Sequence, residues 1–216
     1  MAKALVFDFD GVIVPSEQIK VDGYSLIFSE FGEEVPQAAV IAEARREFAD
    51  GKGNRFDIIR GIFKRLGVSE GLEEKVSMYV QRYGKLVQGR IEALSVNAAT
   101  RATLERLAAM CPLYINSNNP DEALQNTLRS LDVEKYFKAV YGSSHTKVEN
   151  FKTIAQREGV QATDMVFIGD GEGDRNAAQE FGCEFIGIAT ELNGWPVGMK
   201  AFPVVAALPD IEGCLG

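Results

Sequence analysis

Five short runs of almost continuous hydrophobic residues are spread along the chain. Valine, isoleucine, leucine and phenylalanine dominate these runs, without the polar alternation of a half-exposed strand. Such runs are typical of parallel strands that are buried on both faces of a sheet. We therefore predict five strands, at Ala4–Phe9, Leu113–Asn116, Ala139–Gly142, Met165–Ile168 and Glu184–Ala189.

The segments between the later hydrophobic runs have helical periodicity instead. In the first of them, Leu104, Leu107 and Ala108 fall on one helical face. Alternation of strands and helices indicates an α/β fold with a doubly wound, Rossmann-like parallel sheet. The helices predicted in this part of the chain are Thr100–Met110, Glu122–Leu131, Phe151–Glu158 and Arg175–Phe181.

The interval between the first and second predicted strands is much longer than the others and contains only helical patterns. Glycines punctuate these patterns. We expect residues 15–89 to form an inserted helical cap, and residues 1–14 and 90–216 to form the α/β catalytic core. The helices predicted in the cap are Ile19–Phe31, Gln37–Phe48, Asn54–Leu66 and Leu72–Val87.

Charge and composition narrow the choice of partner. The formal net charge is −8, which argues against nucleic acid, because phosphate backbones are bound by clustered lysine and arginine. No apolar run approaches the length of a membrane span, and the N-terminal residues do not resemble a signal peptide. The three cysteines lack metal-binding spacing. We therefore expect a cytoplasmic protein that does not bind membranes, acting as a monomer or small homo-oligomer.

Two acidic clusters follow predicted strands. Asp8 and Asp10 end the first strand on the same side, and Gly11 permits a sharp turn after them. Asp170 and Asp174 lie on a glycine-rich turn after the fourth strand. Each cluster alone also fits a solvated strand end or a helix start. A dinucleotide-binding loop is disfavoured at the second cluster, because Asn176 occupies the place of the third glycine.

Two further polar positions follow the second and third predicted strands. Ser117 and Asn118 offer a hydroxyl and backbone N–H groups to a phosphate, although a turn before Pro120 explains them equally well. Lys147 follows the third strand, where a lone lysine is usually a solvated surface charge. In open α/β sheets, ligands bind beyond the carboxyl ends of the strands, where all these residues are expected.

The order of acids, serine, lysine and acids, each after a strand, resembles the haloacid dehalogenase superfamily of phosphohydrolases. The resemblance covers the whole chain, including the insertion, which is similar to the helical cap of relatives such as phosphoglycolate phosphatase and β-phosphoglucomutase. It is strongest over 7–13 and good over 168–174. It implies a phosphatase acting on a small phosphorylated metabolite through an aspartyl-phosphate.

The resemblance also implies a role for each residue. Asp8 is the expected nucleophile and Asp10 the general acid and base. The phosphate is expected to contact Gly11, Ser117, Asn118 and Lys147. The expected Mg²⁺ ligands are Asp8, the backbone carbonyl of Asp10, Asp170 and, directly or through water, Asp174. In the cap, Lys52 and Arg55 are candidates for contacting the leaving group, although a solvated loop with a helix cap explains them equally well.

Two other functions fit parts of the pattern. A sugar phosphomutase of the same superfamily remains an alternative, although its relatives carry a histidine where this chain has Lys20. The only histidine, His145, lies near Lys147 and either contacts substrate or is incidental. A non-catalytic, phospho-accepting receiver module also combines aspartates, magnesium, serine and lysine. It is the more remote alternative because such modules are shorter and lack a helical insertion.

Overall fold

The computed structural model describes residues 2–29, 36–48 and 53–215. It divides the chain into two compact units. One is a helical unit, Glu17–Ala93, and the other combines the N-terminal segment with the part of the chain from Leu94 onward. The second unit is called the core unit below. These limits lie within a few residues of the boundaries expected between positions 14 and 15 and between positions 89 and 90.

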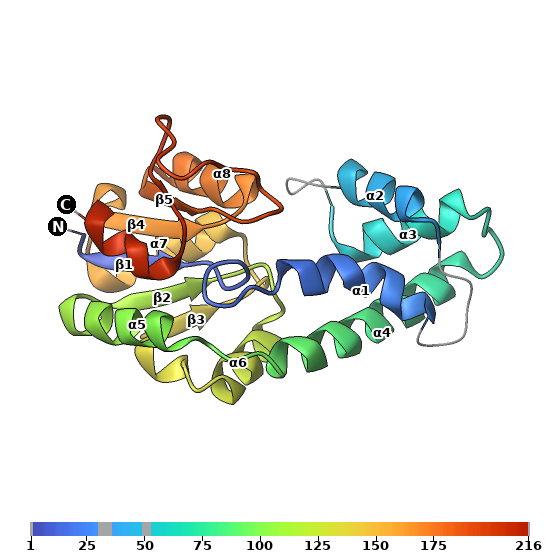
Figure 1. The fold of residues 1–216 in the computed structure, drawn as a ribbon, viewed down its shortest axis with the longest axis horizontal. Helices are drawn as coiled ribbons and strands as arrows, with labels where there is room; N and C mark the ends of the chain where they lie inside the picture. Colours follow the sequence, from blue (N-terminus) through green and yellow to red (C-terminus); the bar gives the residue numbers. More distant parts are fainter. Residues whose placement is uncertain (1, 30–35, 49–52, 216) are drawn as a thin grey trace. The chain divides into compact units, whose positions relative to one another are not determined.

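The core unit is built on a six-stranded sheet in which every neighbouring pair is parallel. The strand order is β3-β2-β1-β4-β5-β6 (Figure 1). This confirms the predicted doubly wound α/β fold. The sixth strand was not predicted, because two residues are too few to produce a recognisable pattern. The strands are β1 (Ala4–Phe7), β2 (Leu113–Asn116), β3 (Ala139–Tyr141), β4 (Met165–Gly169), β5 (Glu184–Ile188) and β6 (Val204–Val205).

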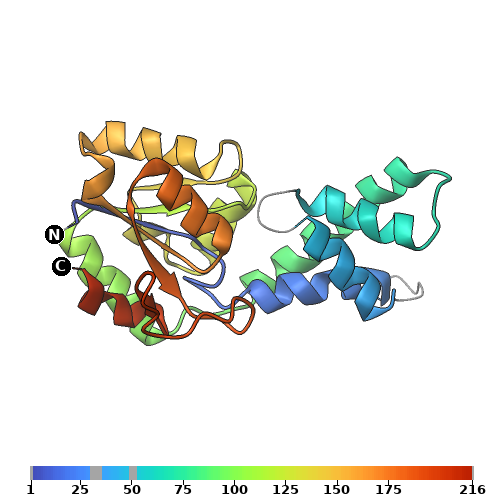
Figure 2. The same cartoon turned by 90° about the horizontal axis from the view of Figure 1, so that it is seen from above.

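Helices cover both faces of this sheet. Figure 2 shows α7 (Lys147–Glu158) and α8 (Glu172–Phe181) on one side, and α5 (Ala98–Met110) and the 3₁₀ segment η3 (Leu208–Cys214) on the other. The described part of the core also contains α6 (Asp121–Ser130) and two short 3₁₀ turns, η1 (Glu134–Tyr136) and η2 (Ala162–Asp164).

Burial on both faces explains the continuous hydrophobic runs. Along β1, Ala4 and Val6 belong to the core cluster beneath α7 and α8, which also contains Phe151 and Phe167. The two phenylalanine rings pack edge to face with centroids 4.9 Å apart. The alternate positions, represented by Phe7, point to the opposite face and are equally buried. A strand covered on both sides cannot alternate hydrophobic with polar residues, which is why the period-two pattern is missing.

The register of the sheet aligns the carboxyl ends of its central strands. Phe7 of β1 pairs with Ile115 of β2 on one side and with Ile168 of β4 on the other. Asp8 is therefore level with Asn116 and Gly169. The chain runs outward from β1 through β2 to β3, then returns to place β4 beside β1. This reversal creates the crevice at which ligands bind in open α/β sheets.

The helical unit contains α1 (Glu17–Ser29), α2 (Ala38–Glu47), α3 (Arg55–Arg65) and α4 (Leu72–Glu92) in its described part. Phe28, Phe63 and Tyr79 form its aromatic core, with ring centroids 4.9 to 5.8 Å apart. Asn54 caps α3 by accepting a hydrogen bond from the backbone of Phe56. Among the described helices of both units, none combines the length and the apolar character required to cross a bilayer.

Candidate active site

Asp8 lies directly after β1 and is almost buried, with 9% of its surface exposed. Its backbone N–H donates to the carbonyl of Ile168, which ties it to the neighbouring strand β4. The Lys147 ammonium lies 3.1 Å from Asp8 Oδ1 and forms an ion pair with it. Apart from this lysine, no described residue donates a hydrogen bond to the buried oxygen. An oxygen in this condition is suited to a cation or to attack on an electrophile.

Lys147 is buried at the start of α7, although sequence alone favoured a surface lysine. Thr146 and Glu149 form a capping box that fixes this helix start. The ammonium also donates to Asp174 Oδ1 and lies 5.2 Å from the centre of the Phe167 ring. Burial alone would lower the pKa of Lys147, but Asp174 and then Asp8 outweigh it and raise that pKa above its usual value. Lys147 therefore remains charged.

Asp174 is the third residue of α8 and is held on both oxygens. Oδ1 accepts from Lys147, and Oδ2 accepts from the backbone N–H groups of Asp170 and Gly171, at 3.2 and 3.0 Å. Gly169 permits this arrangement, because a Cβ atom there would lie 2.6 Å from the Asp174 Cβ. Asp174 thus shapes the turn after β4 and fixes the lysine.

Asp8, Asp170 and Asp174 each offer a carboxylate oxygen, and these oxygens lie within 4.8 Å of one another. The group brings together both acidic clusters of the sequence. Hard oxygen ligands are those that Mg²⁺ prefers, and Mg²⁺ is commonly held by one or two carboxylates with several waters. The Asp8 carboxylate and the half-buried Asp170 fit such an ion best, since both Asp174 oxygens are already engaged.

The electrostatic setting of Asp8 is unfavourable without a metal. The pKa of Asp8 is raised from 3.8 to about 6: burial raises it most, Asp174 and Asp10 add to the rise, and Lys147 opposes it. A divalent ion beside Asp8 would favour the carboxylate form and oppose this shift.

Asp10 is buried outside this three-carboxylate group, and both its oxygens accept hydrogen bonds. Ser16 Oγ donates to Oδ1 at 2.5 Å, and Asn119 Nδ2 donates to Oδ2 at 2.7 Å. Sequence analysis missed both donors. Asn119 lies in the turn already singled out, beside the predicted Asn118, whereas Ser16 carried no sequence signal.

The predicted phosphate-binding residues lie around the same strand ends. Ser117 is buried directly after β2, where its Oγ accepts from the Asn119 backbone N–H at 3.3 Å. Asn118 is exposed. The Gly11 N–H donates to the Val14 carbonyl at 2.8 Å, and is therefore already engaged. Contacts from Gly11, Ser117 and Asn118 to a phosphate stay predictions, as does the metal contact of the Asp10 carbonyl.

The remaining candidates are less defined. His145 is exposed on the loop before α7, and its contact with substrate stays open. Arg55 belongs to the helical unit, where its guanidinium lies 5.8 Å from the centre of the Tyr83 ring. Lys52 lies outside the described residues.

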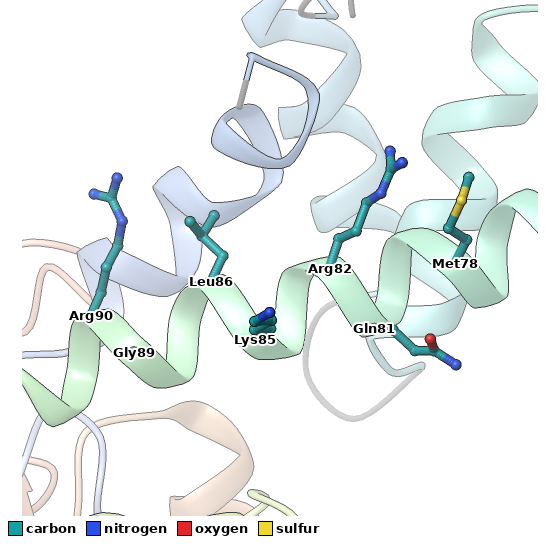
Figure 3. A pocket seen from close by; sticks show the side chains of 7 residues that line it. All are labelled: Met78, Gln81, Arg82, Lys85, Leu86, Gly89 and Arg90. Atoms are coloured by element: carbon teal, nitrogen blue, oxygen red, sulfur yellow. The ribbon is translucent and has the colours of Figure 1, made fainter. Parts of the chain in front are cut away.

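A separate hollow lies along α4 of the helical unit (Figure 3). Arg82, Leu86 and Arg90, spaced four residues apart, project to the same side of the helix in this view. None of the described residues that line it carries a carboxylate, in contrast to the group at the sheet. It is lined by Met78, Gln81, Arg82, Lys85, Leu86, Gly89 and Arg90.

The motif order and the sheet agree with a known family. Residues 5–188 match the family model described as haloacid dehalogenase-like hydrolase. The chain belongs to this family. Curated relatives include phosphoglycolate phosphatases from Escherichia coli K12, 33% identical over 89 residues, and from Yersinia pestis, 31% identical over 124 residues. These matches cover 38% and 54% of this chain, but only 34% and 53% of the relatives, so the chain matches about a third to a half of their length.

Solved structures of haloacid dehalogenase-like proteins share the fold across the whole chain. A Streptococcus pneumoniae member has a TM-score of 0.72 at 22% identity, and covers 100% of this chain and 99% of its own. A Bacillus subtilis hydrolase solved with magnesium has a TM-score of 0.74 at 18% identity, with coverages of 99% and 98%. A Thermotoga maritima protein described as a β-phosphoglucomutase has a TM-score of 0.74 at 21% identity, with the same coverages. Identities this low establish the fold alone.

Proposed function

We propose that this haloacid dehalogenase-like hydrolase is a magnesium-dependent phosphatase that transfers a phosphoryl group from a small metabolite to Asp8 and then to water. The observation that carries the proposal is the environment of Asp8. Its buried Oδ1 lies 3.1 Å from a buried lysine and receives no hydrogen bond from any other described residue, and the Asp8 carboxylate offers an oxygen within 4.8 Å of oxygens of two other carboxylates. This combination suits a nucleophile that receives a phosphoryl group beside a cation.

Two displacements complete the reaction. In the first, a carboxylate oxygen of Asp8 bonds to phosphorus while the ester P–O bond breaks, and Asp10 gives its proton to the leaving oxygen. In the second, Asp10 takes a proton from water as the water oxygen attacks phosphorus, and the bond from phosphorus to Asp8 breaks. Both steps depend on positioning and on charge stabilisation, as phosphoryl transfer generally does.

The other residues hold the charged groups in place. Lys147 offsets the negative charge shared by Asp8 and the phosphate, and Asp174 keeps the lysine aimed at Asp8. Asp8 and Asp170 would hold Mg²⁺, with Asp174 supporting the turn that carries Asp170. When bound, this ion would reduce the repulsion between the Asp8 carboxylate and a phosphate dianion.

Phosphoglycolate is the first substrate to test, since curated relatives of the chain are phosphoglycolate phosphatases. We further propose that Arg55 of the helical unit recognises the part of the substrate that leaves with the ester oxygen. Its guanidinium forms no ion pair with the described residues, in contrast to Arg60, which pairs with Asp57 and Glu73. Arg55→Ala should raise KM on the natural substrate, and unchanged kinetics would remove this role.

The central experiment measures inorganic phosphate released from a panel of phosphorylated metabolites, with Mg²⁺ and with a chelator. Turnover should require the metal and should be abolished in Asp8→Asn, while the far-UV circular dichroism spectrum stays unchanged. A chelator-resistant activity, or a fully active Asp8→Asn enzyme, would refute the mechanism. Interconversion of a hexose 1-phosphate and 6-phosphate without net phosphate release would instead identify a mutase.

A further inference from the structure

Two side chains that are far apart in the sequence donate hydrogen bonds to the Asp10 carboxylate. Ser16 reaches Oδ1 from the segment that follows β1, and Asn119 reaches Oδ2 from the turn after β2. Ser16 has no exposed surface and Asp10 only 7%.

The backbone between Asp10 and Ser16 folds back so that the Ser16 hydroxyl reaches the Asp10 carboxylate. Gly11 adopts a φ of 71°, which a residue with a side chain rarely does, and its N–H donates to the Val14 carbonyl at 2.8 Å. The Ser16 N–H donates to the same carbonyl at 2.9 Å. The chain therefore turns back after Asp10 and brings Ser16 against it. Ser16 is also the last residue of the core unit before Glu17 begins the helical unit.

Asn119 is also held in place, by hydrogen bonds of its own backbone. The Asn119 backbone N–H donates to Ser117 Oγ at 3.3 Å, and its carbonyl accepts from the Ser143 N–H at 2.9 Å. Gly142 allows this packing, since a Cβ atom there would lie 2.5 Å from the Asn119 carbonyl oxygen. The amide that holds Asp10 is thus joined through its own backbone to the predicted phosphate-binding serine.

We propose that Ser16 and Asn119 are positioning residues that fix the Asp10 carboxyl group in the orientation required for proton transfer. This inference rests on the proposed role of Asp10 as general acid and base. A carboxyl group with free side-chain torsions samples many orientations, and a proton is transferred only at hydrogen-bond distance to the reacting oxygen. Two donors from separate strand ends restrict that sampling before substrate binds.

The alternative explanation is purely structural, since a buried serine hydroxyl must find an acceptor somewhere. The two explanations differ in their dependence on the leaving group. 4-Nitrophenolate leaves as a stable anion and needs no proton, whereas an alkoxide such as that of glycolate does. Misplacing Asp10 should therefore spare phosphoryl transfer from 4-nitrophenyl phosphate but slow both steps with an alkyl phosphate. A general loss of packing would slow phosphoryl transfer from both esters alike.

The test compares Ser16→Ala, Ser16→Thr and Asn119→Ala on 4-nitrophenyl phosphate and on the best alkyl phosphate from the metabolite panel. Ser16→Ala should lower kcat on the alkyl ester by roughly 10- to 100-fold, which is up to the lower end of the contribution of acid–base catalysis, with little change in KM. Ser16→Thr, which keeps the hydroxyl, should restore most of that loss. Ser130→Ala removes an exposed hydroxyl on α6 and should leave both activities unchanged.

Rapid mixing separates the two chemical steps. In Ser16→Ala, 4-nitrophenyl phosphate should give a fast burst approaching one nitrophenolate per active site. A slow phase should follow, because the second step still needs Asp10 to accept a proton from water. Asn119→Ala should show the same burst, and the double variant should lose less than the product of the two single losses because both act through one carboxylate.

Equal losses on both esters without a burst, or full activity in both single variants, would overturn the positioning role. If Ser16→Ala does not fold, Asn119→Ala carries the same test. Failure of the proposed phosphatase itself gives a different result, since the unmodified enzyme would then release no phosphate from any substrate.

Discussion

Asp8→Asn should make the metal-free protein more stable at neutral pH, even though it removes the proposed nucleophile. The pKa of Asp8 is raised from 3.8 to about 6 in the folded protein, chiefly by burial. A carboxyl group whose folded pKa exceeds its unfolded pKa binds its proton more tightly in the folded state. Stability from this group is therefore complete below the unfolded pKa and is lost as pH rises through about 6.

The size of the effect follows from the two pKa values. At about pH 8 the shift corresponds to about 3 kcal/mol of lost stability, and at about pH 4.5 to about 1 kcal/mol. Asparagine resembles the neutral carboxyl group and avoids the loss. The stability difference between Asp8→Asn and the unmodified protein should thus widen by about 2 kcal/mol over this range.

Urea unfolding in the presence of a chelator, across this pH range, measures that difference. Asp210→Asn, which makes the same change at an exposed carboxylate of the core unit, is the matched control. Saturating Mg²⁺ should stabilise the unmodified protein by about 2.7 kcal/mol at one hundred times its Kd, and should stabilise Asp8→Asn less. A difference that stays constant with pH would refute the burial argument for Asp8.

Three other changes test the supports of the site. Gly169→Ala should lower stability by about 1–3 kcal/mol and reduce kcat, because its Cβ would displace Asp174, as unfolding and steady-state assays can check. Asn150→Ala should lower the free energy of unfolding by about 1–3 kcal/mol and lower kcat, because the buried Asn150 amide donates to Asn116, which in turn donates to the Lys147 carbonyl. Thr153→Ala, on the exposed face of α7, is its control. Cys183, whose pKa burial raises to about 12, should remain unlabelled by iodoacetamide near pH 7.5 in the native protein and react after unfolding, as mass spectrometry would show.

The central strands were predictable because their signal is local. A strand covered on both faces needs a continuous hydrophobic run, and β1, β2 and β4 have one in sequence. The two-residue β6 has no such signal. It forms because Val204 and Val205 pair beside β5, a contact between distant residues that no sequence window contains.

The two acidic clusters were also predictable, because each directly follows a strand whose register is set by hydrophobic pairing. The surroundings of those residues were not. Lys147 reads as a surface lysine until the fold places it between Asp8 and Asp174. Ser16 looks like an ordinary serine near a helix start, and only the turn at Gly11 brings it against Asp10.

The aspartates at this end of the sheet differ in what their neighbours supply. Asp174 has two backbone N–H groups and Lys147, and Asp10 has Ser16 and Asn119. Asp8 shares this lysine with Asp174, and no other described residue donates a hydrogen bond to its buried Oδ1. Hydrogen bonds stabilise a carboxylate and make it a weaker nucleophile, so an aspartate with few donors on one oxygen is well suited to attack phosphorus. The stability lost at Asp8 is thus tied to its proposed reactivity, and a hydrogen-bond donor added beside Lys147 at Oδ1 should stabilise the fold at the expense of turnover.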